Sequence, residues 1–128
     1  MTKYILVIDD EESVRDAYCL ALDMQYIVEV VSNGLDGINS VKLKRPDLIF
    51  LDFKMSGISG VETLKRLQKI DPTIPVFIIT AFIKEHLDEI IKARNEGCVF
   101  DIAGKPLNSY MIRQFVMAKL ESPTNILC

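Results

Sequence analysis

The chain has 128 residues, a formal net charge of −3 and 49% hydrophobic residues. This length predicts one domain with a sizeable core, and the acidic balance argues against nucleic-acid binding, which usually requires a basic face. No apolar stretch of the sequence is long enough to cross a bilayer, and the 3 cysteines match neither a disulfide framework nor a zinc site. We therefore expect a cytoplasmic protein with reduced thiols and no membrane insertion.

Apolar runs and helical periodicities alternate along the chain. Short apolar or β-branched runs predict strands at residues 4–8, 27–31, 48–51, 76–79 and 98–102. Apolar residues at helical spacing predict helices over about residues 14–24, 35–41, 61–67, 83–97 and 108–120. Five strand–helix units predict an α/β fold with helices on both faces of a parallel sheet, because such crossovers are right-handed.

The run at residues 48–51 carries no charge and stops at Asp52. Further along, Ser59 and Glu62 have the spacing of a capping box, which predicts the start of the next helix. Asp52 is therefore expected at the carboxyl end of a central strand, the edge at which open α/β sheets bind ligands. Position alone leaves a second interpretation open, in which Asp52 is a solvated residue at a strand end.

Four of the five predicted strands stop at a polar group that suits phosphoryl chemistry. These groups are Asp9 with Asp10, Asp52, Thr80 and Lys105. Each alone has a simpler explanation, such as favourable negative charge at a helix N-terminus for Asp9 and Asp10, or a solvated loop charge for Lys105. Their occurrence together at one edge of the sheet favours a shared site.

This pattern resembles the receiver domain of bacterial two-component response regulators over residues 3–120. The residues that carry the resemblance are Asp9-Asp10, Phe50-Leu51-Asp52, Thr80-Ala81 and Lys105-Pro106. The resemblance implies a flavodoxin-like (βα)5 doubly wound parallel sheet with strand order 2-1-3-4-5, in which the first and third strands are neighbours. It further implies a receiver domain over residues 1–120 and a short tail over residues 121–128, with no output domain.

The same resemblance implies a role for each site residue. Asp52 is expected to take a phosphoryl group from a phosphohistidine. Mg²⁺ is the expected cofactor, because a hard cation relieves the repulsion among carboxylates and bridges to phosphoryl oxygens. Asp10 and Asp52 are the expected direct ligands, Asp9 acts through water, and the backbone carbonyl of Lys54 completes the set.

Two further roles concern the phosphoryl group itself. Lys105 is expected to neutralise one of its oxygens, and the hydroxyl of Thr80 to donate a hydrogen bond to it. The Lys105–Pro106 bond is expected to be cis, as is typical of the family. These roles describe a signalling phospho-switch, which catalyses only its own phosphorylation and dephosphorylation, and not an enzyme in the usual sense.

The implied partners are a sensor histidine kinase or a histidine phosphotransfer protein, and a downstream protein target. The histidine-bearing partner is expected to dock near Ser13 and Arg15. The downstream target is expected on the face formed by residues 83–94, the fifth strand and residues 108–120.

Several positions depart from the family pattern. Ile102 stands where the family usually has an aromatic switch residue, and Phe100, two residues earlier, is the alternative candidate for that role. Gly37 replaces the usual alanine and Ser56 the usual proline, so we expect looser local structure at both. Phe82 occupies a position that tunes hydrolysis of the phosphoryl group in the family, and its bulk is expected to shield the site from water.

Two other functions share part of this residue pattern. A receiver-like interaction module that is not regulated by phosphorylation is kept open by the altered switch position. A phosphatase of the haloacid-dehalogenase kind would need a second acid two residues after the nucleophile, where this chain has Lys54.

Overall fold

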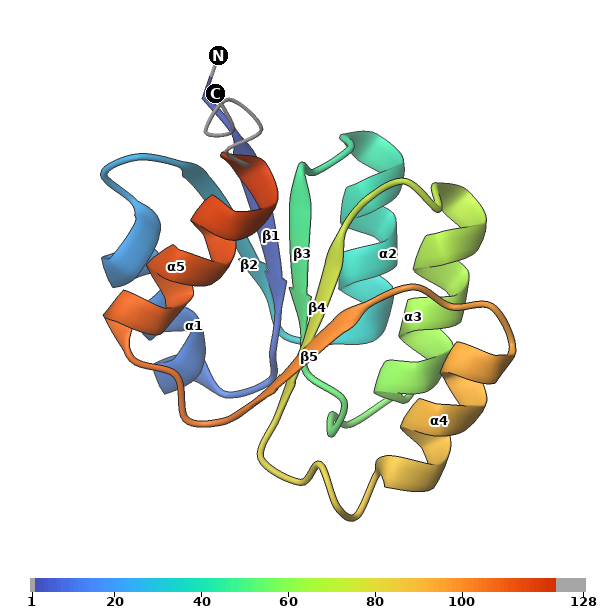
Figure 1. The fold of residues 1–128 in the computed structure, drawn as a ribbon. Coiled ribbons are helices and arrows are strands. Elements are labelled where there is room, and N and C mark those ends of the chain that lie inside the picture. The colour runs from blue at the N-terminus through green and yellow to red at the C-terminus, as the bar shows by residue number, and fades with distance from the viewer. Residues whose placement is uncertain (1, 122–128) are drawn as a thin grey trace, which may run out of the picture.

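The computed structural model describes residues 2–121, so Cys128 and all but the first residue of the expected tail lie outside the described residues. Within that range five strands alternate with five helices (Figure 1). Their bounds are β1 Tyr4–Ile8, α1 Glu12–Leu22, β2 Ile27–Val31, α2 Gly34–Leu43, β3 Leu48–Leu51, α3 Gly60–Ile70, β4 Val76–Thr80, α4 Leu87–Asn95, β5 Asp101–Gly104 and α5 Ser109–Leu120. None of these helices is both long enough and apolar enough to span a membrane.

The strands form one parallel sheet in the order β2-β1-β3-β4-β5. Helices α1 and α5 cover one face, and α2, α3 and α4 cover the other (Figure 1). The predicted α/β fold, its flavodoxin-like (βα)5 architecture and the strand order 2-1-3-4-5 are therefore confirmed.

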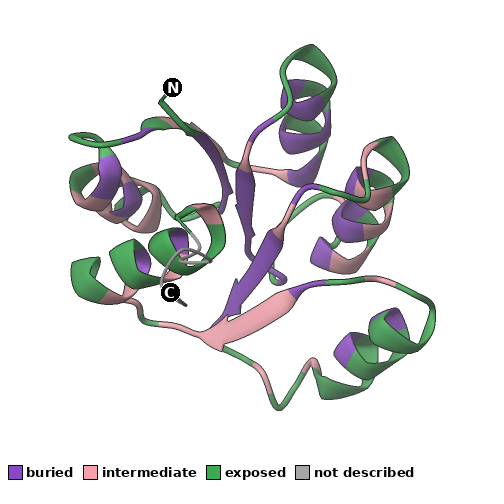
Figure 2. Ribbon diagram, turned by 45° about the horizontal axis from the view of Figure 1, so that its top comes forward, coloured by how far each residue is buried: buried purple, intermediate pink, exposed green. Residues whose placement is uncertain are grey.

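Strands β1, β3 and β4 carry no charged residue because both of their faces are buried (Figure 2). Alternate residues of β1 serve different cores: Ile5 and Val7 pack toward α1 and α5, whereas Leu6 and Ile8 pack toward the opposite helices. This two-sided burial fixes the register of the central strands, because a shift of one residue would exchange the two cores.

Three helices begin at a side-chain cap. Asn33, Ser59 and Asn108 each accept a hydrogen bond from a backbone N–H three residues ahead, at 2.8, 3.1 and 2.8 Å. The predicted helix start at Ser59 is confirmed. The carboxylate of Glu62 accepts a hydrogen bond from Arg66 Nε at 2.8 Å, one turn further along α3.

The fifth strand lies later than predicted, at Asp101–Gly104 and not at residues 98–102. The backbone of Val99 is engaged elsewhere: its N–H donates to Gln68 Oε1 and its carbonyl accepts from Gln68 Nε2. Cys98 N–H donates back to the carbonyl of Ala93. With these groups occupied, pairing with β4 starts only at Asp101.

The fourth helix begins at Leu87, later than the predicted residue 83. His86 N–H bonds to the carbonyls of Phe82 and Ile83, which closes tight turns ahead of the helix. Apolar spacing includes Ile83 in the helical pattern, but this residue lies in the loop that follows β4.

The expected looseness at Gly37 is not what the structure shows. A Cβ atom at Gly37 would lie 2.4 Å from Cδ1 of Ile8, so the side chain of Ile8 occupies the space that an alanine would need. The glycine in α2 and the isoleucine at the end of β1 thus form a complementary pair.

Candidate functional site

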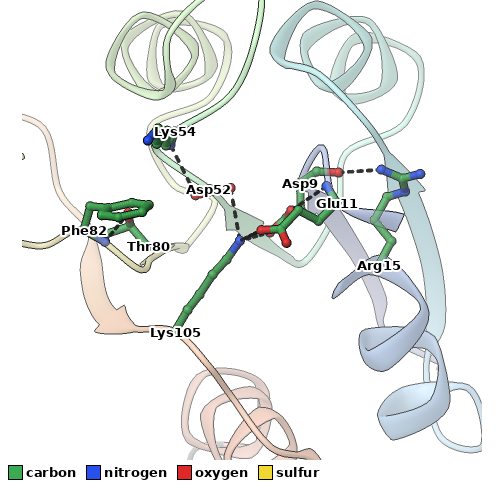
Figure 3. A network of polar contacts seen from close by, with 8 residues as sticks. All are labelled: Asp9, Glu11, Arg15, Asp52, Lys54, Thr80, Phe82 and Lys105. Atoms are coloured by element: carbon green, nitrogen blue, oxygen red, sulfur yellow. Dashed lines mark hydrogen bonds and ion pairs between the residues drawn. The ribbon is translucent and has the colours of Figure 1, made fainter. Parts of the chain in front are cut away.

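Two buried carboxylates follow the neighbouring strands β1 and β3. Ile8 pairs with Leu51, so Asp9 and Asp52 leave the sheet at the same level. Hydrogen bonds continue the pairing by one step, from Asp52 N to Ile8 O at 3.0 Å and from Asp9 N to Val31 O at 3.1 Å. Asp9 and Asp52 are only 2% and 4% exposed. The parallel sheet thereby holds two carboxylates side by side at its carboxyl edge, as Figure 3 shows.

The ammonium of Lys105 lies among three carboxylates (Figure 3). Its Nζ is 2.9 Å from Asp9 Oδ2, 3.1 Å from Glu11 Oε1 and 3.2 Å from Asp52 Oδ2. Burial alone would disfavour the charged form, but the hydrogen bond to Asp9 and the negative charges around it raise the pKa of Lys105 above its usual value. Lys105 therefore carries a permanent positive charge in the site.

The backbone around Lys105 sets the position of this charge. Lys105 N–H donates to the carbonyl of Thr80 at 3.0 Å, which continues the β4–β5 pairing. The following Lys105–Pro106 bond is cis, as the sequence predicted.

Asp52 is held at both oxygens. Its Oδ1 accepts from the backbone N–H of Lys54 at 3.2 Å, and its Oδ2 accepts from Lys105. Burial first, and the charge of Asp9 second, raise the pKa of Asp52, while Lys105 acts in the opposite direction. The site therefore disfavours the charged form of this carboxyl group, and a cation relieves this.

Four acidic side chains form a cluster at this edge. One carboxylate oxygen from each of Asp9, Asp10, Glu11 and Asp52 lies within 4.8 Å of the others. Oxygen donors of this kind and number suit Mg²⁺, which combines a few carboxylates with water molecules. Glu11 was not among the predicted ligands, although it continues the acidic run that follows β1.

Thr80 and Phe82 border the site from the end of β4. Thr80 is fully buried, and its Oγ1 accepts from the backbone N–H of Phe82 at 3.2 Å. An open cavity of about 440 Å³ lies in front of Asp52, between the loops that follow β3 and β4. Lys54, Phe82 and Lys105 all line it. Four of the sequence-predicted residues thus line one cavity, namely Asp10, Asp52, Lys54 and Lys105, whereas Asp9 and Thr80 are buried next to it.

The chain's family follows from comparison with known proteins. The family model of the response regulator receiver domain matches residues 5–116. The chain belongs to this family. Its acidic cluster is accordingly of the type that forms the Mg²⁺ site of receiver domains, and the domain is a signalling module and not a conventional enzyme.

Receiver relatives differ in how much of their length this chain spans. Sporulation initiation phosphotransferase F of Bacillus subtilis is 34% identical over 126 residues, which cover 98% of this chain and 99% of that protein. A protein-glutamate methylesterase/protein-glutamine glutaminase of Halalkalibacterium halodurans is 32% identical over 130 residues, but the chain spans only 37% of its length. A CheY-like receiver domain protein of Methanospirillum hungatei superposes with a TM-score of 0.85 at 23% identity, covering 94% of this chain and 95% of that one, which supports the fold alone.

Of the two candidates for the receiver's aromatic switch, Ile102 lies in β5 and Phe100 directly precedes that strand. Ile102 pairs with Ile78, two steps before the Thr80–Gly104 pair. Phe100 precedes the strand and is 4% exposed, and the guanidinium of Arg94 stacks 4.4 Å from its ring centre. Arg94 also donates to the carbonyl of Phe100 at 2.9 Å. Phe100 is therefore anchored at the end of β5 that is further from Thr80.

Proposed function

We propose that this receiver domain is a phosphoacceptor in a two-component or phosphorelay system, with Asp52 as the residue that is phosphorylated. The observation that carries the proposal is the contact of Lys105 Nζ with Asp9, Glu11 and Asp52, which places a fixed cation beside a buried carboxylate in an open cavity. A carboxylate so placed is a suitable nucleophile for phosphoryl transfer. The name of the Bacillus subtilis relative, a phosphotransferase, agrees with this chemistry.

In the proposed reaction, an oxygen of Asp52 attacks the phosphorus of a phosphohistidine. The phosphorus–nitrogen bond breaks, the histidine ring leaves and takes up one proton, and an acyl phosphate remains on Asp52. Lys105 stabilises the negative charge on a phosphoryl oxygen, and Thr80 turns its hydroxyl to the new group as a hydrogen-bond donor. Lys105 lines the cavity in front of Asp52, and Thr80 lies next to it at the end of β4, where its hydroxyl accepts from the backbone N–H of Phe82.

The acidic cluster supports a role for a divalent cation. We propose that Asp10, Asp52 and the backbone carbonyl of Lys54 would bind Mg²⁺ directly and that Asp9 would act through water. Glu11, which the structure adds to the cluster, would adjust the charge at its rim. When bound, Mg²⁺ supplies positive charge that offsets repulsion among the carboxylates and the phosphoryl oxygens.

The proposed partners follow from the surfaces next to the site. A sensor histidine kinase or histidine phosphotransfer protein would reach Asp52 across the start of α1, where Arg15 already donates to the backbone carbonyl of Asp9 at 2.9 Å. A downstream protein target would bind the α4–β5–α5 face. This face carries exposed apolar side chains, namely Leu87, Ile91 and Tyr110.

Intact-mass measurement tests the phosphoacceptor. The protein is incubated with acetyl phosphate and Mg²⁺, alongside an Asp52→Asn variant and a sample with the metal chelated. We expect a gain of one phosphoryl group that requires both Asp52 and Mg²⁺. A second series with a phosphorylated histidine phosphotransfer domain as donor covers the case of a receiver that rejects small donors.

The alternative function, an interaction module that phosphorylation does not regulate, makes the opposite prediction. Its supporting observation is Ile102 in place of the aromatic switch residue, with Phe100 held by Arg94. If folded protein gains no phosphoryl group from either donor, this alternative replaces the proposal.

A further inference from the structure

A second cavity lies behind the phosphorylation site, between α1 and the start of α5. Its volume is about 340 Å³. Most of the residues that line it are apolar, among them Val14, Ala17, Ile79, Leu107 and Ile112. Helices α1 and α5, which supply several of its lining residues, lie on the same face of the sheet (Figure 1). Ligand pockets in proteins begin at about 300 Å³ and combine apolar walls with a few polar groups.

Tyr18 of α1 supplies the polar group. Its side chain lines the cavity, and the residue is only 2% exposed. The hydroxyls of Tyr4 and Tyr26 each bond to a glutamate, whereas that of Tyr18 has no hydrogen-bond partner within residues 2–121. In the same range every fully enclosed polar side-chain atom is paired. The Tyr18 hydroxyl oxygen is therefore not fully enclosed by protein atoms. Because Tyr18 lines this cavity, we infer that its hydroxyl faces the cavity.

The charge around the cavity limits what can enter. Burial, and then the charges of Asp9 and Asp52, raise the pKa of Tyr18, so its hydroxyl remains a proton donor. Glu11 also lines the cavity and would repel an anion. In the unphosphorylated protein the ammonium of Lys105 is engaged by three carboxylates at the phosphorylation site, so it favours no anion in this second cavity. A neutral molecule with a hydrogen-bond acceptor matches this lining.

We propose that the cavity between α1 and α5 binds a neutral, mainly apolar molecule of one or two rings, and that Tyr18 donates a hydrogen bond to its acceptor group. The size follows from the volume, because a closed apolar cavity of about 150 Å³ already holds one benzene ring. Glu11, Ala81 and Lys105 line both this cavity and the one in front of Asp52. A molecule bound in the second cavity would thus contact Lys105 on the side away from Asp52. By shifting the Lys105 side chain, it would alter the phosphorylation site.

Three matched probes test the proposal on the unphosphorylated protein in metal-free buffer, so the result does not depend on the proposed phosphorylation. The probes are 2-acetylnaphthalene, which has an acceptor, 2-ethylnaphthalene, which has none, and 2-naphthoate, which is an anion. Amide chemical shifts in ¹H–¹⁵N spectra give the binding site and the dissociation constant. We expect saturable shifts centred on Ala17, Tyr18 and Ile112, with 2-acetylnaphthalene binding about five-fold more tightly than either of the other two, as one neutral hydrogen bond allows.

Two variants separate the hydrogen bond from the cavity. In Tyr18→Phe the advantage of 2-acetylnaphthalene over 2-ethylnaphthalene should disappear, whereas in Tyr110→Phe, a matched change of an exposed tyrosine, it should persist. Ala17→Met should fill the cavity and abolish binding of both, and its spectrum shows directly whether the variant is folded. Absence of saturable binding, shifts centred on another surface, equal affinity for 2-naphthoate or an unchanged preference in Tyr18→Phe would each overturn the proposal.

Discussion

The ammonium of Lys54 lies 4.3 Å from the centre of the Phe82 ring. The two residues belong to different loops that border the site. Both residues line the cavity in front of Asp52. A cation over the face of an aromatic ring is attracted by about 0.5–1 kcal/mol at an exposed position. This contact joins the loop after β3 to the loop after β4, directly above the proposed phosphoacceptor.

Phe82→Ala is expected to shorten the lifetime of the phosphorylated protein. Loss of the ring removes both a hydrophobic cover and the partner of Lys54, so water reaches the acyl phosphate more often. A contact of this strength corresponds to a change of about two- to five-fold in the decay rate. The lifetime is measured by intact mass after the phosphodonor is removed.

Lys54→Met is a second test of the same contact, and Lys84→Met is its matched control. Lys54→Met removes the ammonium and leaves the backbone carbonyl, so the lifetime should shorten in the same direction. Lys84 lies outside the cavity in front of Asp52, and its substitution should leave the lifetime unchanged. A lifetime in Phe82→Ala equal to that of the wild type would rule out shielding.

Asp52→Asn is expected to stabilise the protein in the absence of divalent cations. Burial and then Asp9 raise the pKa of Asp52, so its ionised form weakens the folded state. A carboxyl group of this kind destabilises above its raised pKa, and the penalty fades as the pH falls toward the pKa of the unfolded chain. At pH 7 in EDTA the gain in the free energy of unfolding should be on the order of 1 kcal/mol.

Urea unfolding at a series of pH values measures this gain. It should shrink as the pH approaches 3.8, the ordinary value for Asp52, and be absent below it. Asp101→Asn removes a carboxylate that pairs with Lys119, so this control should not be stabilised. An Asp52→Asn variant no more stable than the wild type at pH 7 would contradict the prediction.

Gly37→Ala is expected to destabilise the protein despite the better helix propensity of alanine. The added Cβ would lie 2.4 Å from Cδ1 of Ile8, a methyl group that Ile8→Val removes. The two substitutions should therefore couple: the double variant should be more stable than the sum of the single effects predicts, by about 1 kcal/mol. Thermal or urea unfolding of the four proteins measures the coupling, and strict additivity would show that the contact is relieved without strain.

Asp71 is expected to titrate far below an ordinary aspartate. Hydrogen bonds from the Thr73 side chain and backbone, and then from Arg45, hold the pKa of Asp71 at about 2. Because folding lowers this pKa, the contribution to stability is complete above 3.8 and is lost as the pH falls through about 2. The carboxyl ¹³C resonance reports the midpoint, and Thr73→Val should move it upward. A midpoint near 3.8 in the wild type would refute the assignment.

Local sequence patterns predict much of the fold. Strands β1, β3 and β4 are buried on both faces, so their runs are free of charge and easily located. Ser59 and Asn108 mark helix starts because their oxygens accept from free N–H groups one turn ahead. The carboxyl ends of parallel strands meet at one edge, so Asp9 and Asp52 lie together after the neighbouring strands β1 and β3. The long side chain of Lys105 reaches them from the end of β5.

Other features depended on contacts between distant residues. The start of β5 was misplaced because Gln68, 31 positions away, engages the backbone of Val99, and no local pattern records that bond. Membership of Glu11 in the acidic cluster depends on the direction of one side chain at the beginning of α1.

The sequence by itself determined most of the strand and helix segments and the residue types at the sheet edge, because burial and periodicity are properties of short segments. The strand order was implied by the resemblance of its motifs to those of receiver domains. Only the tertiary structure decided how side chains share space: Ile8 fills the gap at Gly37, Lys54 lies over Phe82, and Tyr18 lines a cavity between two helices. Such arrangements depend on packing between segments far apart in the chain, where a fraction of an ångström separates a filled space from an open one.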